Sequence, residues 1–315
     1  MIKRAAVFAL CIVISISLCS CYDYKELKNY TFVMGIGVDL EDGRYKVTAE
    51  LGCISDGGNE VRQAQKSSVI ERSAASFPLA LSLLTDTTGG ELYFKNCAVA
   101  VLGEELCENG ISDVVEYLVK SPDFQTGMTL ATAVGKAENI FSVEPTADGI
   151  ISTELSRSIR SGEQGLSNSI SVPPYRVQNE LQSGRHIALT RLRAVGGGKT
   201  TVEAGGLGII KDGRQVCTLS SADAVFYMIM RSLAKKAVIE CENGSLQLQK
   251  CYAKQENGEF KLTLITAGKR EDIPKNAENE LKSKAENIRK YLFAYGVDEL
   301  PKEEIGIDII SESER

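Results

Sequence analysis

The sequence predicts an α+β fold of several domains, in which mixed and antiparallel sheets built from β-hairpins pack against helices. Three Asp-Gly or Asn-Gly turn signals, at 42–43, 212–213 and 257–258, each separate two strand-like runs. Helical stripes of apolar residues occur in groups between these hairpins, without the regular strand–helix alternation of a parallel sheet. A hydrophobic content of 43% and a charged content of 25% are typical of a globular protein.

The first part of the chain combines a hairpin, a helix and a further strand. β-Branched residues predict a buried strand over 32–38. Its partner over 45–51 is half-buried, because apolar residues alternate there with Lys46, Thr48 and Glu50. The segments predicted next are a loop over 56–66, a helix over about 68–84 with the two glycines at 89–90 as its end signal, and strand structure within 91–102.

The middle of the chain is predicted to be mainly helical. An i, i+3, i+4, i+7 stripe from Ile111 to Leu118 predicts an amphipathic helix that ends at the Ser-Pro pair 121–122. The other predictions are helices over 130–141 and 148–160, no regular structure at the prolines 173–174, and helical or extended structure within 175–192.

Three consecutive glycines at 196–198 are the best candidate for a linker, and the hairpin pattern restarts after them. We therefore divide the chain into a signal peptide (1–20), an N-terminal α+β region (21–198) that can subdivide near 145–170, and a shortened C-terminal α+β domain (199–315). The predicted C-terminal elements are strands over 200–210, 214–219, 246–253 and 260–264, helices over 222–236 and 281–295, and a short strand within 302–315.

The first twenty residues have the pattern of an export signal. Lys3 and Arg4 precede a run of 14 apolar and small residues, which is too short for a comfortable membrane span. The sequence Leu-Cys-Ser-Cys at 18–21 then has the lipobox pattern, in which cleavage precedes a cysteine that carries diacylglycerol. Cys21 is the better candidate, because bulky Leu18 would directly precede the alternative, Cys19.

We therefore predict a mature lipoprotein that begins at Cys21 and is tethered to a membrane without spanning it. Two or three acyl chains, such as palmitate, hold a protein on a bilayer stably at about 0.8 kcal/mol per buried methylene. The alternatives are an ordinary cleaved signal peptide and an uncleaved anchor, neither of which needs a cysteine at this place.

Charge and cysteine content limit the partners and the chemistry. Loss of Lys3 and Arg4 with the signal takes the formal net charge from −6 to −8, which argues against nucleic acid and against electrostatic binding to anionic lipid. Mostly free, buried thiols are expected, with a Cys241–Cys251 disulfide left open. The cysteines that remain in the mature chain besides Cys21 are Cys53, Cys97, Cys107, Cys217, Cys241 and Cys251.

The sequence offers no catalytic, cofactor-binding or metal-ligating constellation. The Gly-Lys-Thr at 198–200 lacks the first glycine of a phosphate-binding loop and is followed by a β-branched run. Gly35 and Gly37 lie within a predicted strand, where glycine indicates close packing of a neighbour. His186 is the single histidine, and its neighbours Gly184 and Arg185 predict an exposed loop.

Residues 21–27 (Cys-Tyr-Asp-Tyr-Lys-Glu-Leu) lead into a Gly-Ile-Gly-Val-Asp segment at 35–39. Together with residues 92–94, 102–106 and 203–213, these segments resemble the C subunits of spore germinant receptors, the Ger(x)C lipoprotein family. The first two are similar to the start of the mature family members, and the others to later strand and hairpin segments. In order and spacing, the resemblance extends over almost the whole mature chain.

The resemblance implies a non-enzymatic lipoprotein on the outer face of the inner spore membrane. It would take part in nutrient sensing together with two integral-membrane subunits, one of them permease-like, and its chemistry would be confined to the lipidation of Cys21. A solute-binding lipoprotein of a transporter is the alternative function, and a tethered hydrolase without a recognisable site is a third.

Overall fold

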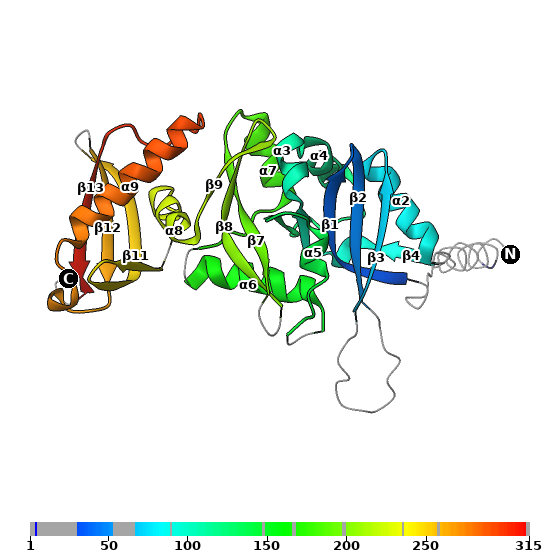
Figure 1. Cartoon of the computed structure of the whole chain (residues 1–315), viewed down its shortest axis with the longest axis horizontal. Coiled ribbons are helices and arrows are strands. Elements are labelled where there is room, and N and C mark those ends of the chain that lie inside the picture. The colour runs from blue at the N-terminus through cyan, green and yellow to red at the C-terminus, as the bar shows by residue number, and fades with distance from the viewer. Residues whose placement is uncertain are drawn as a thin grey trace, which may run out of the picture.

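The computed structural model describes Arg4 and residues 30–52, 67–88, 90–146, 149–165, 168–196, 200–234, 236–256 and 259–312. The predicted signal peptide, Cys21, Cys53, the predicted loop over 56–66 and the turn at 257–258 lie outside these residues. In the described part, a nine-stranded sheet and a four-stranded sheet lie side by side along the long axis of the molecule (Figure 1).

The larger sheet is mixed. Its order is β3-β2-β1-β5-β6-β7-β8-β9, with β4 beside the start of β1. The central group β1, β4, β5, β6 and β7 is parallel, and the pairs β2–β3 and β8–β9 extend it as antiparallel strands at the two edges. The strands are β1 (Tyr30–Glu41), β2 (Arg44–Gly52), β3 (Ser67–Ala74), β4 (Glu91–Tyr93), β5 (Val99–Leu102), β6 (Thr129–Ala133), β7 (Ile187–Val195), β8 (Thr201–Lys211) and β9 (Arg214–Leu219).

Helices cover both faces of this sheet. Ala100 and Leu102 of β5 belong to one apolar core, whereas Val99 and Val101 belong to the core on the opposite face. Burial on both faces explains why β5 is apolar throughout and does not alternate. The first core takes in α2 (Phe77–Thr88), α3 (Glu104–Asn109), α4 (Ser112–Lys120) and α7 (Pro174–Gln182), and the second takes in α5 (Glu138–Phe141) and α6 (Ile151–Gly165).

The smaller sheet has the order β10-β11-β12-β13, in which the last pair is parallel. Helix α9 packs on it through a buried stripe that includes Leu281, Ile288 and Leu292. Helix α8 lies between the two sheets and is buried on all sides over 224–230, as expected of a helix that is apolar all round. These elements are α8 (Ser221–Met230), β10 (Ala237–Cys241), β11 (Gly244–Glu256), β12 (Glu259–Thr266), α9 (Ala277–Ala294) and β13 (Glu304–Ser311), and two 3₁₀ turns lie at Phe94–Asn96 and Arg270–Asp272.

The mixed sheets and their packed helices confirm the predicted α+β class, but several element predictions are wrong. The helix predicted over 68–84 is strand β3 followed by α2. Of the helix predicted over 130–141, the first four residues belong to strand β6 and only the last four, α5, are helical. β6 is buried on both faces, and such a strand can imitate a helical stripe, whereas β3 is a largely exposed edge strand without a clear alternation. Pro174 begins α7 rather than preventing it, because proline suits the first turn of a helix.

The strands on either side of the predicted linker at 196–198 pair with each other. β7 and β8 are antiparallel neighbours, and β8 and β9 belong to the same sheet as β1. The change from one sheet to the other therefore lies beyond α8, about thirty residues later than the predicted boundary at 198. Whether the regions fold as separate domains stays a prediction.

Close packing at the first strand confirms the interpretation of its glycines. A Cβ atom on Gly35 would lie 2.1 Å from the Ser152 hydroxyl of α6, and one on Gly37 would lie 3.1 Å from the Phe141 ring. Glycine at these two places lets α5 and α6 approach the backbone of β1, so the Gly-Ile-Gly segment serves packing.

Candidate functional site

The predicted lipidation site, Cys21, lies outside the described residues and stays a prediction. The described part therefore offers other candidates: buried polar groups, cysteines and surface hollows. Within that part, no group of three or more histidine, cysteine or acidic side chains is arranged to hold a metal ion. None of the described helices is both long and apolar enough to cross a bilayer.

A buried carboxylate, that of Asp39, lies at the carboxyl end of β1. Its Oδ1 accepts a hydrogen bond of 2.7 Å from the amide of Ala137, and its Oδ2 accepts one of 3.0 Å from the amide of Glu138. Burial raises the pKa of Asp39, and these two amides oppose the rise. The side chain thus holds the start of α5 against the sheet.

Ion pairs surround this carboxylate and hold the same turn. Lys46 pairs with Glu138, and the pairing raises the pKa of Lys46 and lowers the pKa of Glu138. Glu104 accepts a hydrogen bond of 2.8 Å from the Gly135 amide and pairs with Arg191 of β7. Most side chains of this edge are therefore paired with one another, although Nε of Arg191 is buried without a hydrogen-bond partner in the described part. The pairing suits a structural role in holding the turn better than acid–base catalysis.

A second buried carboxylate, that of Glu50, fastens α6. Although the alternation in β2 suggested a half-exposed polar position, Glu50 is only 1% exposed, because α6 covers this face of the strand. Its two oxygens accept hydrogen bonds of 2.8 Å each from the amides of Ile151 and Ser152, and the Ser152 hydroxyl also donates to it. A carboxylate at a helix N-terminus meets unpaired amides and the positive end of the helix dipole.

The prediction that His186 lies in an exposed loop is wrong, because its side chain is completely buried where β7 begins. Its Nδ1 lies 2.9 Å from Oε1 of Glu299, and the same oxygen accepts a hydrogen bond of 2.7 Å from the His186 amide. Its Nε2 lies 3.0 Å from the Tyr227 hydroxyl of α8. Glu299 follows α9 in the chain, so His186 joins the larger sheet to the C-terminal elements.

Burial lowers the pKa of His186, whereas the neighbouring Glu299 carboxylate raises it in part. The unfolded chain then takes up a proton below pH 6.5 that the folded chain resists, so stability falls on acidification, by up to about 1.4 kcal/mol per pH unit. We expect the unfolding free energy of the wild type to decrease between pH 7.5 and pH 5 relative to that of a His186→Gln variant.

Urea unfolding of both chains at several pH values measures this difference. Asp39 is common to both chains, so its contribution cancels when the two stabilities are subtracted. Parallel curves for the two chains would contradict the expectation, because they would mean that His186 titrates alike in the folded and unfolded states.

The five cysteines in the described part are free, and four of them are buried. Burial raises the pKa of Cys97 and of Cys251 to about 12, which makes their thiolates scarce at neutral pH. The Cys241–Cys251 disulfide that the sequence left open does not form. Cys241 stands opposite Gly244 on β11, and seven residues of strand, about 24 Å, separate Gly244 from Cys251.

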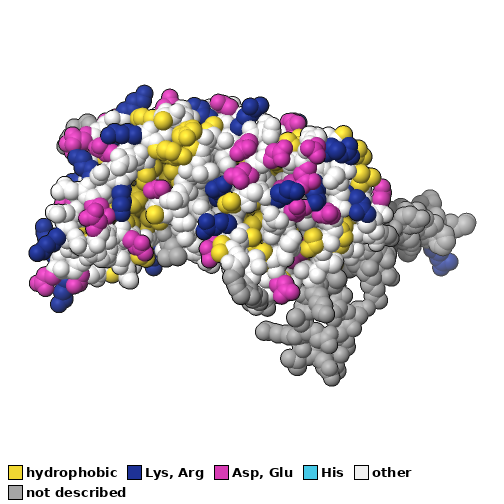
Figure 2. All heavy atoms as spheres, viewed as in Figure 1, with side chains coloured by type: hydrophobic (Ala, Val, Ile, Leu, Met, Phe, Trp, Pro, Cys, Tyr) yellow, Lys and Arg dark blue, Asp and Glu magenta, His cyan; other side chains and the backbone are white. Residues whose placement is uncertain are grey.

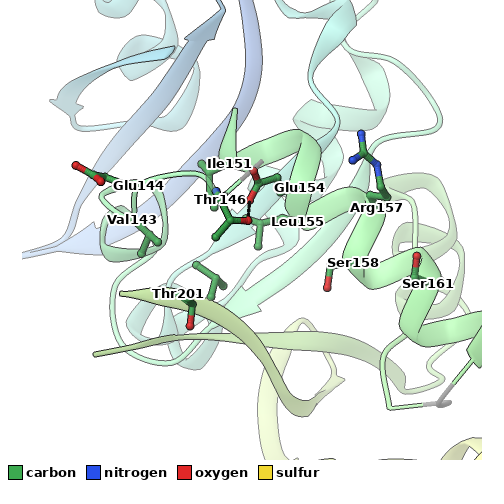
Figure 3. A pocket seen from close by; sticks show the side chains of 11 residues that line it. Val143, Glu144, Thr146, Ile151, Glu154, Leu155, Arg157, Ser158, Ser161 and Thr201 are labelled. Atoms are coloured by element: carbon green, nitrogen blue, oxygen red, sulfur yellow. Dashed lines mark hydrogen bonds between the residues drawn. The ribbon is translucent and has the colours of Figure 1, made fainter. Parts of the chain in front are cut away.

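Hollows in the described surface are further candidates for a binding site, and three of them are lined by helices of the core. One of about 330 Å³ lies between α6, the segment before it and the start of β8 (Figure 3). Glu154 projects into it and accepts hydrogen bonds of 3.0 Å and 2.8 Å from the amide and hydroxyl of Thr146, while Glu144 and Arg157 lie at opposite margins in Figure 3. The others are one of about 460 Å³ between α8 and β10, and one of about 200 Å³ between α7 and α8.

Acidic and basic side chains are interspersed over the face shown in Figure 2, without a large area of a single sign. Such a surface does not attract polyanions over long distances. Sequence reasoning missed the fastening roles of Asp39 and Glu50, and it placed His186 at the surface. An acidic residue at the end of an otherwise apolar strand, as in the segment 35–39, was the available signal for Asp39.

Comparison with known proteins assigns the chain to a protein family. The model of the family described as "Spore germination protein N-terminal domain" matches residues 23–194, from just after Cys21 to the end of β7. Among curated proteins of Bacillus subtilis (strain 168), the chain is 20% identical to "Putative spore germination protein YfkR" over 275 residues, 80% of this chain and 70% of that protein.

Two other relatives match shorter stretches. "Spore germination protein KC" of the same organism is 25% identical over 167 residues, and "Spore germination protein B3" is 23% identical over 144 residues. These matches cover 50% and 44% of this chain but only 41% and 38% of the two relatives, so the matched stretch spans less than half the length of either.

Among solved structures, the crystal structure of the GerBC protein aligns with a TM-score of 0.48 and 15% identity, covering 92% of this chain and 99% of that one. The family model carries the assignment, since it matches more than half of the 315 residues. The chain therefore belongs to the family of spore germination proteins that includes the C subunits of germinant receptors.

Proposed function

We propose that this protein is a lipid-anchored, non-catalytic subunit of a nutrient germinant receptor and takes part in spore germination by docking on partner subunits. Its acyl chains on Cys21 would hold it on the outer face of the inner spore membrane. Its partners would be two integral-membrane subunits, one of them permease-like. A tether of this kind raises the effective concentration of the folded body beside those partners.

The observation that carries the proposal is the family match, which begins at residue 23, two residues after the cysteine of the lipobox pattern. The folded family domain thus follows the proposed anchor directly. The curated relatives bear the names of spore germination proteins, which supports the same process for this chain.

The arrangement of polar groups supports docking over catalysis. The buried carboxylates of Asp39 and Glu50 accept hydrogen bonds from backbone amides and fasten helices to the sheet. Burial also raises the pKa values of Cys97 and Cys251, which disfavours a thiolate nucleophile at either position. A rigid body of this kind is suited to presenting a surface to partners.

Replacement of Cys21 by alanine tests the anchor. We expect the Cys21→Ala chain to lose incorporation of labelled palmitate, to leave the membrane fraction and to lose nutrient-triggered germination, because the acyl attachment site is gone. A Cys19→Ala chain is the matched control and should remain lipidated and functional. Full germination with a soluble Cys21→Ala chain would contradict the proposal.

Affinity isolation of a C-terminally tagged chain from detergent-solubilised spore membranes tests the partners. Recovery of a permease-like protein and a second multi-span receptor subunit is the expected result. Recovery of an ABC permease instead would favour a solute-binding lipoprotein and overturn the assignment.

A further inference from the structure

The hollow between α7 and the end of α8 is small, polar and positively charged at its sides. Its volume is about 200 Å³, and its polar lining comprises Arg176 and Glu180 of α7, His186 at the start of β7, and Tyr227 and Arg231 from α8 and its end. On each helix the two polar residues are four apart, so one turn of each faces the other across the hollow.

The acidic side chains near the hollow are already engaged. Glu180 pairs with Arg185 at 2.6 Å, and that pairing lowers the pKa of Glu180. Oε1 of Glu299 is taken by His186. The charges of Arg176 and Arg231 also help to lower the pKa of Glu180, but the hydrogen-bonded partner of this carboxylate is Arg185. The hollow itself is lined by two arginines and one carboxylate.

Both lining arginines have guanidinium N–H groups that make no hydrogen bond within the described residues. Arg231 reaches Oε2 of Glu299 only at 3.8 Å, beyond hydrogen-bonding distance. The Arg176 side chain has no hydrogen bond or ion pair with any residue of the described ranges, and it is exposed. A guanidinium offers five N–H donors in a planar fork that matches an oxyanion.

Two buried polar atoms beside the hollow lack a well-formed hydrogen bond within the described part. Oε2 of Glu299 is buried without a hydrogen-bond partner in the described part, and Nδ1 of His186 faces Glu299 without a well-directed bond. Buried polar atoms are rarely left in this state. Oε2 of Glu299 is an acceptor and calls for a donor such as an ordered water, so it does not itself attract an anion. The volume suits a group of a few heavy atoms with one planar or tetrahedral anionic end.

We propose that this hollow binds a small oxyanion, a carboxylate or a phosphate, between the guanidinium groups of Arg176 and Arg231. The site is independent of the proposed anchor at Cys21 and of the receptor partners. Because the sequence contains a single histidine, the ring of His186 at the floor of the hollow is a unique spectroscopic reporter.

The test uses the full chain, purified in detergent without a histidine tag and labelled with ¹³C at the histidine Cε1. Sodium acetate and sodium phosphate are titrated separately at pH 7.5 and constant ionic strength, with sodium chloride as the reference. We expect a saturable shift of the His186 resonance with acetate, phosphate or both, and at least a tenfold weaker midpoint in Arg176→Gln and in Arg231→Gln.

Arg193→Gln is the matched control. Arg193 is exposed on β7, the strand that begins directly after His186, and it does not line the hollow. That variant should bind as the wild type does. Saturation by acetate alone would assign the site to carboxylates, and saturation by phosphate alone would assign it to phosphate groups. Shifts that equal those with chloride, or that persist in both arginine variants, would overturn the proposal.

Discussion

Replacement of Gly206 by alanine is expected to lower the unfolding free energy by at least about 4 kcal/mol, a large part of the roughly 5–15 kcal/mol that stabilises a typical domain. Gly206 lies at an irregularity between β7 and β8, where β8 contains one residue more than its partner, and its φ is +105°. A side chain at this φ is strained, and its Cβ would lie 2.0 Å from the backbone carbonyl oxygen of Leu219. Because the obstacle is backbone, the pairing of β8 with β9 would have to change.

Gly205→Ala is the matched control for this prediction. A Cβ at Gly205 would meet its nearest neighbour, the Arg191 carbonyl oxygen, at an ordinary 3.6 Å. We expect that variant to stay within about 1 kcal/mol of the wild type. Urea unfolding followed by far-ultraviolet circular dichroism measures both, since the chain has no tryptophan. Equal stability of the two variants would show that the strand pairing around Gly206 is wrong.

The second large effect is expected at Glu50. Replacement by glutamine keeps the shape but turns one of the two acceptor oxygens into an NH₂ group that would face a backbone amide of α6. The start of α6 would lose charge-assisted hydrogen bonds in a buried place, at a cost of about 2–4 kcal/mol. Hydrogen exchange should speed up first at the amides of Ile151 and Ser152, which donate to Glu50.

Glu71→Gln on the neighbouring strand β3 is the control for Glu50→Gln. Its side chain is 56% exposed and makes an ion pair of 3.1 Å with Lys46. Exposed ion pairs of this kind contribute about 1 kcal/mol or less. If Glu50→Gln is no more destabilising than Glu71→Gln, Glu50 does not fasten α6.

Much of the fold was predictable from local patterns. The hairpins at 42–43 and 212–213 and the helices α4, α6 and α9 lie close to where turn signals and helical stripes predicted them. The strands β3 and β6 were misread, because their apolar residues do not alternate cleanly with polar ones. β10 was missed, since five residues are too few to show a period.

The parallel centre of the large sheet could not be read from the sequence. The crossovers from β5 to β6 and from β6 to β7 contain α3 and α4 in the first case and α5, α6 and α7 in the second. Several short helices in one connection hide the strand–helix alternation by which parallel sheets are recognised. Their pairing is a long-range property that only the folded chain shows.

The sequence by itself determined the α+β class, the receptor-family resemblance and the candidate anchor at Cys21, because these depend on local spacing and residue type. The tertiary structure decided the burial of His186 and the roles of Asp39 and Glu50 at helix starts. It also decided that Arg176 and Arg231 face one hollow. These residues meet partners that are mostly forty or more positions away in the chain, and only the packing of the elements brings such groups together.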